Sequence, residues 1–112
     1  MPWTIDKALK DEAIERTEIT NKGYSFWLKG IPTQIHVILS VNPAQGGFNF
    51  HLSHFIRTPK QADPYCPSRP WGDDEAYALH MAVTSITQYY REAVNAGISP
   101  SSEWLIQNTY GI

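Results

Sequence analysis

Residues 34–57 read QIHVILSVNPAQGGFNFHLSHFIR and contain two alternating segments on either side of a turn signal. In residues 34–41 and again in residues 48–57, apolar and polar side chains follow each other with a period of two. This alternation is typical of a half-buried β-strand. Proline, asparagine and glycine in residues 42–47 favour a tight connection between the two segments. The stretch therefore predicts an antiparallel hairpin.

A third alternating segment, residues 24–29, precedes this hairpin. If the connection at residues 30–33 is an even-length turn, the apolar residues of all three segments share one face. The expected pairs are Leu28–Ile35, Phe26–Val37, Tyr24–Leu39, Val41–Phe48, Leu39–Phe50 and Val37–Leu52. A slip of one residue would turn each apolar set to the opposite face. The three segments thus predict a three-stranded antiparallel meander.

A long helix is predicted for residues 73–96. Asp73 or Asp74 provides an N-cap, and Gly97 favours the left-handed conformation that ends a helix. One apolar stripe follows at spacings of three and four: Ala76, Leu79, Val83, Ile86, Tyr90 and Ala93. We expect this stripe to pack on the apolar face of the sheet.

The ends of the chain give weaker signals. Residues 4–16 predict a first helix with Thr4 as N-cap, whereas residues 16–21 fit neither element. Pro100 is expected at the first position of a short turn, after which residues 104–106 dock the tail. The expected fold is α+β in the order α-β-β-β-α, with residues 1–112 forming a single domain.

Composition limits the classes of function. The net charge of −2 and a pI of about 6.0 argue against nucleic-acid binding, which usually requires a basic surface. Cys66 is the only cysteine, so an intramolecular disulfide is impossible and a reducing compartment is favoured. The sequence begins without a signal-peptide pattern and has no apolar run long enough to span a bilayer. We therefore expect a cytoplasmic protein without a membrane partner.

A proline-rich loop is predicted at residues 58–73, and loops of this length are often functional. A small molecule would bind in a pocket between this loop and the sheet. The candidate ligand-binding residues are His54, Arg57, Tyr65, Arg69 and His80. The simpler interpretation is that His54 lies at the edge of the core, with hydrogen-bond partners for its ring nitrogens within the protein. A separate alternative concerns the cations of the loop, Arg57, Lys60 and Arg69, which are expected to pair with the acids Asp63, Asp73 and Asp74 if they bind no anionic ligand.

Metal binding and catalysis receive little support. His36 and His51 lie diagonally on neighbouring strands, but no acid or cysteine completes a metal site. Cys66 and His80 are a conceivable nucleophile and base, yet the acids at residues 73–75 would raise the pKa of a nearby thiol. We assign no catalytic residue, metal or cofactor, and favour a non-catalytic protein over the alternative of an enzymatic pocket between the sheet and the loop of residues 58–73.

The sheet face opposite the core carries Trp27, Ile38 and Phe55 among polar side chains. Exposed aromatic patches often mark contact sites. The alternative is that the first helix or the C-terminal tail covers this face. These three residues predict an accessory module that binds a protein partner, including a homodimer partner.

The expected order of helix, three strands and helix resembles the double-stranded RNA-binding domain. That resemblance implies contacts to phosphate and ribose hydroxyl groups. In that family the last helix begins with a basic cluster, whereas this chain has the acids Asp73, Asp74 and Glu75. Nucleic-acid binding is therefore the lowest-ranked function.

Four short motifs carry a second resemblance: SHFIRTP at residues 53–59, QADPY at 61–65, PSRPW at 67–71 and EAYALH at 75–80. Over residues 53–108 the chain is similar to small uncharacterised bacterial proteins of the type found on mobile gene cassettes of integrons. The resemblance implies no activity, so it assigns no functional residue.

Overall fold

The predicted hairpin joins β3 (Ile35–Val41) to β4 (Phe48–Leu52) in the computed structural model, which describes residues 3–21 and 23–109. Oδ1 of Asn42 accepts hydrogen bonds from the backbone N–H groups of Ala44 at 2.9 Å and Gln45 at 3.1 Å. Gly47 then adopts a φ of 68°, which favours glycine. The expected register is confirmed. Its apolar pairs are Val41–Phe48, Leu39–Phe50 and Val37–Leu52.

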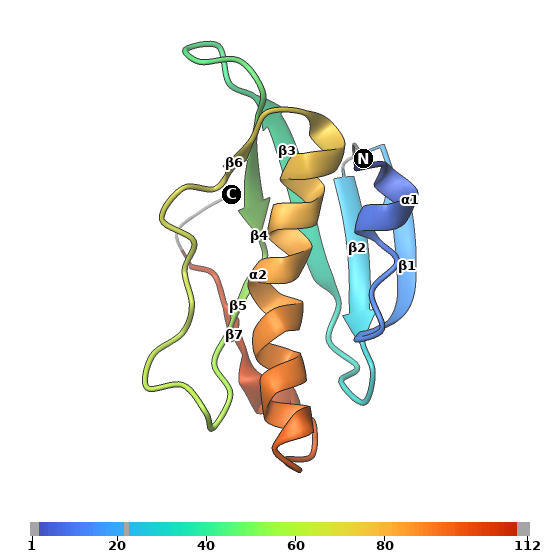
Figure 1. Cartoon of the computed structure of the whole chain (residues 1–112), viewed down its shortest axis with the longest axis vertical. Helices are drawn as coiled ribbons and strands as arrows, with labels where there is room; N and C mark the ends of the chain where they lie inside the picture. Colours follow the sequence, from blue (N-terminus) through green and yellow to red (C-terminus); the bar gives the residue numbers. More distant parts are fainter. Residues whose placement is uncertain (1–2, 22, 110–112) are drawn as a thin grey trace.

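The hairpin is the centre of a five-stranded antiparallel sheet with the order β1-β2-β3-β4-β6 (Figure 1). The added strands are β1 (Ile14–Thr20), β2 (Gly23–Leu28) and β6 (Trp71–Gly72). The α+β class with an antiparallel sheet is therefore confirmed. The three predicted strands form the antiparallel centre of this sheet as β2, β3 and β4, but the sheet and the α-β-β-β-α order differ in detail from the prediction, because β1 and β6 extend the sheet on both sides.

The first helix is much shorter than expected: α1 spans Ile5–Ala8, not residues 4–16. Thr4 caps it, since its hydroxyl accepts from the backbone N–H of Lys7 at 3.2 Å. Asp11 then redirects the chain by accepting from the N–H of Ala13 through its side chain and from that of Ile14 through its carbonyl. The following residues form β1, whose branched side chains suit a strand.

The register between β2 and β3 is two residues away from the expected one. Phe26 pairs with Ile35 and Tyr24 pairs with Val37, instead of Phe26 with Val37. The reason is Ile31, which is buried in the core and draws extra residues into the connection. Because the shift is even, each side chain keeps the face that alternation predicted.

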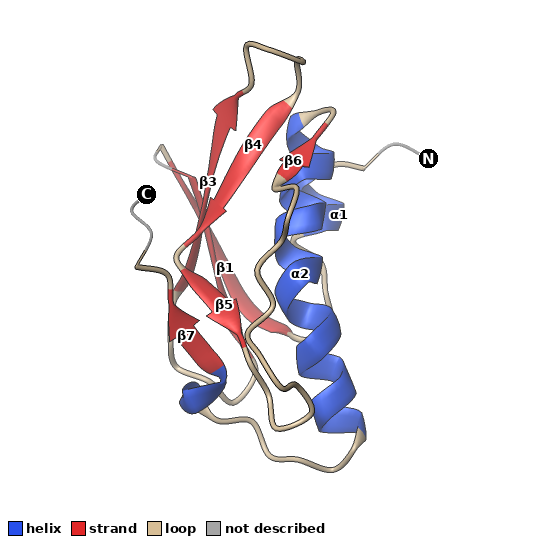
Figure 2. Ribbon diagram, turned by 90° about the vertical axis from the view of Figure 1, so that its left-hand side faces the viewer, coloured by secondary structure: helices blue, strands red, loops and turns tan. Residues whose placement is uncertain are grey.

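The third predicted strand, residues 48–57, is divided at Ser53. Its second half is β5 (His54–Ile56), which pairs with β7 (Leu105–Gln107) in a separate two-stranded sheet (Figure 2). The hydroxyl of Ser53 accepts a hydrogen bond of 2.8 Å from the backbone N–H of His36. The backbone N–H of Ser53 donates to the carbonyl of His36. These bonds satisfy polar groups where the strand bends.

The long helix is confirmed as α2 (Glu75–Asn95). Asp74 is its N-cap and accepts from the backbone N–H of Tyr77 at 2.8 Å. Gly97 follows the helix with a φ of 86°, as its position predicted. No helix in residues 3–21 and 23–109 is long and apolar enough to cross a membrane.

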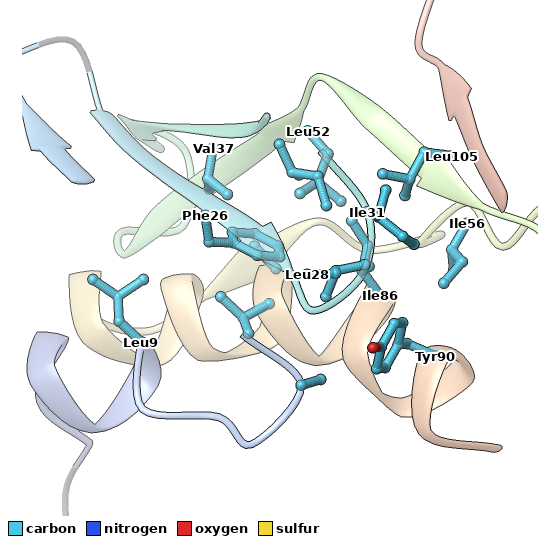
Figure 3. Close-up of a cluster of buried hydrophobic side chains, with 14 of the residues drawn as sticks. Leu9, Phe26, Leu28, Ile31, Val37, Leu52, Ile56, Ile86, Tyr90 and Leu105 are labelled. Carbon is cyan, nitrogen blue, oxygen red and sulfur yellow. The ribbon is translucent and has the colours of Figure 1, made fainter. Parts of the chain in front are cut away.

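The hydrophobic core lies between α2 and the adjacent face of the sheet (Figure 3). Phe26, Val37 and Leu52 point toward the helix, which confirms the central prediction from alternation. Five residues of the predicted α2 stripe are buried: Leu79, Val83, Ile86, Tyr90 and Ala93. α1 lies beside α2 on the same face of the sheet (Figure 1).

The C-terminal segment differs in detail from its prediction. The short 3₁₀ helix η1 (Ser102–Trp104) is capped by Ser101, so Pro100 lies before the cap and not at the first helical position. Trp104 and Leu105 are buried and dock this segment, whereas Ile106 is 39% exposed. The carbonyl of Trp104 accepts from the backbone N–H of Arg57 at 2.8 Å.

Candidate functional site

The candidate site is the sheet surface that faces away from α1 and α2, which we call the outer face (Figure 2). Strand alternation places one side chain per pair of residues on this surface. Its members in β1 to β4 are Arg16, Glu18, Ser25, Trp27, His36, Ile38, Ser40, Asn49 and His51. Trp27 and Ile38 are half-buried, and Ser25 is fully buried beneath its neighbours. The predicted positions of Trp27 and Ile38 opposite the core are therefore confirmed.

Trp27 has a cationic neighbour on β1. The two strands pair Arg16 with Trp27, and the guanidinium carbon lies 3.9 Å from the centre of the indole ring. A guanidinium over an aromatic face is attracted by the negative charge density of the ring. The contact covers part of the indole and holds Arg16 across the strand pair.

A chain of hydrogen bonds crosses the middle of the outer face. The side-chain amide of Gln34 donates to the hydroxyl of Ser25 at 2.9 Å, and this hydroxyl lies 2.9 Å from Nδ1 of His36. Because the serine oxygen already accepts from Gln34, its proton is available to Nδ1. Ser53 is a second serine placed beside a histidine ring. Its hydroxyl accepts from the backbone N–H of His36 and lies 2.8 Å from Nδ1 of His54.

The small second sheet presents Phe55 and Ile106 together. These residues pair directly across β5 and β7, while their neighbours Ile56 and Leu105 face the core. Phe55 is half-buried and Ile106 is 39% exposed. Phe55 thus adjoins an apolar residue that the sequence did not associate with it, because the pairing joins segments about fifty residues apart.

The edge strand β1 is a feature of the site that sequence reasoning missed. Every residue from 15 to 20 is exposed, and within the described residues β1 pairs only with β2. No apolar alternation marks this strand, because neither of its faces is deeply buried. The available signal was the density of branched residues in IERTEIT, where Ile14, Thr17, Ile19 and Thr20 favour a strand.

The proline-rich loop forms a hollow of about 270 Å³ against α2. Tyr65 and Arg69 both line it, together with Phe50 and Gln88. Tyr65 is fixed from two sides: its backbone bridges to Ile56, and its ring lies 4.9 Å from the ring of Tyr89. Two of the five predicted ligand-binding residues therefore share a concave surface.

The other three predicted residues lie elsewhere. Arg57 lines a different hollow beside Trp104, and its Nε donates to the carbonyl of Ala62 at 3.1 Å. His54 faces Ser53 on β5. His80 stacks on Trp3, with ring centres 3.6 Å apart and planes inclined by 16°.

The expected ion pairs of the loop do not form within the described part of the chain. Arg57, Lys60 and Arg69 have no carboxylate partner there, and the ion pair of residues 3–21 and 23–109 joins Arg91 to Asp11 at 2.8 Å. Within this part of the chain, none of the three loop cations is therefore held by a carboxylate.

Two half-buried histidines have shifted pKa values. Burial lowers the pKa of His54. Burial also lowers the pKa of His80, against the opposing effect of the Asp11 carboxylate. Cys66 is exposed in the loop. Within residues 3–21 and 23–109, no three histidine, cysteine or acidic side chains gather as metal ligands would.

The geometry thus offers an aromatic and polar sheet surface, an exposed strand edge and a small hollow under the loop. Histidine side chains and serine hydroxyls on the outer face can form hydrogen bonds with another chain. Comparison of the sequence and structure with protein-family models, curated proteins and solved structures finds no match.

Proposed function

We propose that this chain is a small non-catalytic accessory module that binds a protein partner, including a second copy of itself, through the outer face. The asymmetry of the sheet carries the proposal, because α1 and α2 both lie on one side of it (Figure 2). Trp27 and Ile38 are half-buried on the open side, and Phe55 is half-buried on the neighbouring strand β5. Aromatic side chains are enriched at the centres of protein interfaces.

The polar groups of the outer face support protein binding over chemistry. On this face, Nδ1 of His36 lies within hydrogen-bond distance of the Ser25 hydroxyl, which fixes the ring. A general base needs a nitrogen directed at a reacting group held beside it. A fixed ring is instead suited to form a hydrogen bond with a backbone group of a docked chain.

Photo-crosslinking tests the proposal. Benzoylphenylalanine replaces Ile38 on the outer face in one variant and Val94, which is 39% exposed on α2, in a matched control. We expect the probe at Ile38 to capture a protein, either a partner or a second copy, far more efficiently than the probe at Val94. Trp27→Ser should reduce that capture. Equal yields from both probes, or none, would count against the outer face as a docking surface.

A second candidate function is binding of a small anionic molecule in the hollow under the loop. The observation that favours it is the shared lining of Tyr65 and Arg69, since a guanidinium beside an aromatic ring can bind a carboxylate group. Ligand screening by NMR with Arg69→Ala as control tests this candidate. Shifts confined to the hollow and lost in the variant would support it.

Location and origin complete the proposal. The single cysteine supports a cytoplasmic location, and the motifs of residues 53–80 support a relation to proteins of mobile gene cassettes. The net charge of −2 argues against nucleic acid as partner. Cell fractionation tests the location, and the genes on either side test the cassette origin.

A further inference from the structure

β1 provides an exposed strand edge at one side of the sheet. Its residues 15–20 are exposed, and the opposite edge, β6, has only two residues. An edge strand presents backbone N–H and C=O groups along its free side, and these groups can pair with a strand of another chain. A second copy of this chain brings the same edge, so the pairing is antiparallel around a two-fold axis.

Side-chain direction limits the registers of such a pair. Arg16 and Glu18 point to the outer face, whereas Thr17 and Ile19 share the face of Phe26 and Tyr24. Residues that oppose each other in an antiparallel pair must point to the same face. The axis therefore passes through a residue of β1 and not between two residues.

Charge then selects one of the remaining registers. With the axis at Thr17, Arg16 of each copy opposes Glu18 of the other, and both pairs are of opposite charge. With the axis at Arg16 or Glu18, that residue opposes its own copy and like charges meet, which is unfavourable. With the axis at Ile19, Glu18 opposes Thr20 and the charge pairs are lost. β1 is thus complementary to itself in one register.

We propose that two copies of this chain associate through antiparallel pairing of β1 around Thr17. The inference deepens the proposed function, on which it rests, because pairing joins two outer faces into one continuous surface. In the single chain the guanidinium of Arg16 lies over Trp27, on the side of β1 away from the edge. In the dimer, the side chain of Arg16 leaves this contact with Trp27 and crosses its own strand to meet Glu18 of the second copy. One strand pair buries little surface, so the dimer is weak and concentration-dependent.

Disulfide trapping tests the register. The variant T17C in a C66S background places two cysteines directly opposite each other at the axis, within reach of a disulfide. The matched control I19C, also with C66S, keeps its cysteines about 13 Å apart in this register. We expect T17C to form a covalent dimer in mild oxidant and I19C to remain monomeric. A strong I19C dimer, or no T17C dimer, would overturn the proposal.

Charge reversal provides a second test that does not depend on cysteine chemistry. R16E or E18R alone places like charges at both cross-strand pairs, so we expect the dimer to weaken roughly tenfold or more at low salt. The double variant R16E/E18R restores opposite charges, and we expect affinity within about threefold of the parent. Sedimentation measures each affinity, and thermal unfolding verifies that each variant folds. A double variant as weak as the singles contradicts the pairing.

Failure of this inference is distinguishable from failure of the proposed function. If T17C does not cross-link while the probe at Ile38 still captures a protein, the outer face binds partners and β1 does not pair. If T17C cross-links while that probe captures nothing, β1 pairs and the outer face is not the docking surface.

Discussion

Phe26 provides the sharpest test of how the sheet and helix hold together. It lies in β2 between β1 and β3, and its side chain is fully buried, with 0% exposure. Replacement by alanine removes the ring and leaves a cavity under α2. Ile19→Ala is the matched control, because Ile19 lies on the same sheet face but is 60% exposed.

Phe26→Ala should lower the free energy of unfolding by about 3–5 kcal/mol, the usual cost of truncating a buried phenylalanine. A domain of this size is stable by only about 5–15 kcal/mol, so the variant keeps little margin. The melting temperature should fall by roughly 15 °C or more. Ile19→Ala should change the free energy of unfolding by less than about 0.5 kcal/mol.

Urea unfolding followed by circular dichroism measures the free energy of unfolding of both variants. It also gives the slope of this free energy against urea concentration, which must stay constant for the comparison to be valid. A cost below about 1 kcal/mol for Phe26→Ala, or equal costs for both variants, would refute the packing described for this face.

Three further changes have defined outcomes. Tyr24 donates a hydrogen bond of 2.6 Å to Glu75, and burial together with this carboxylate raises its pKa to about 12, so Tyr24→Phe should remove the last step of a spectroscopic tyrosine titration. Gly72→Ala would bring Cβ within 2.5 Å of the backbone of α2 and should lower the free energy of unfolding by at least about 2 kcal/mol in urea. Burial raises the pKa of Asp11, but hydrogen bonds and the charge of Arg91 outweigh this effect and lower it overall. Ionised Asp11 therefore contributes fully to the free energy of unfolding above its unfolded pKa of about 3.9, and this contribution is lost as the pH falls below that value. Asp11→Asn should flatten this part of the acid-unfolding curve.

The parts of the fold that were predictable from sequence are those that bury one face deeply. Alternation in β3 and β4 predicted their pairing residue by residue, and the stripe from Leu79 to Ala93 predicted the buried side of α2. In both cases any other register or helix orientation would have exposed many apolar side chains, so the pattern allowed one arrangement.

Errors occurred where local pattern carried little information. β1 has no buried face, so its residues show no apolar alternation. The predicted first helix was therefore extended into residues 14–16, which belong to β1. Burial of Ile31 in a connection displaced the β2–β3 register by two residues. β6 and β7 are two and three residues long and depend on partners that are distant in sequence.

The candidate site was predictable to the same extent. Period-two alternation placed Trp27 and Ile38 on the outer face regardless of the register error, because an even shift preserves direction. The five residues assigned to a ligand pocket were chosen for their proximity in sequence to the loop. Only Tyr65 and Arg69 share a hollow, since Arg57 and the two histidines lie on elements that diverge.

The central claim is that the outer face and its β1 edge bind protein. The most direct measurement is the change in amide chemical shifts when the ¹⁵N-labelled chain is diluted from high to low concentration. We expect changes concentrated at Arg16, Thr17, Glu18, Trp27 and Ile38. Changes located instead on the solvent side of α2, at Met81 and Val94, would contradict protein binding by the outer face and β1. The absence of any change, both on dilution and on addition of a captured partner, would contradict it as well.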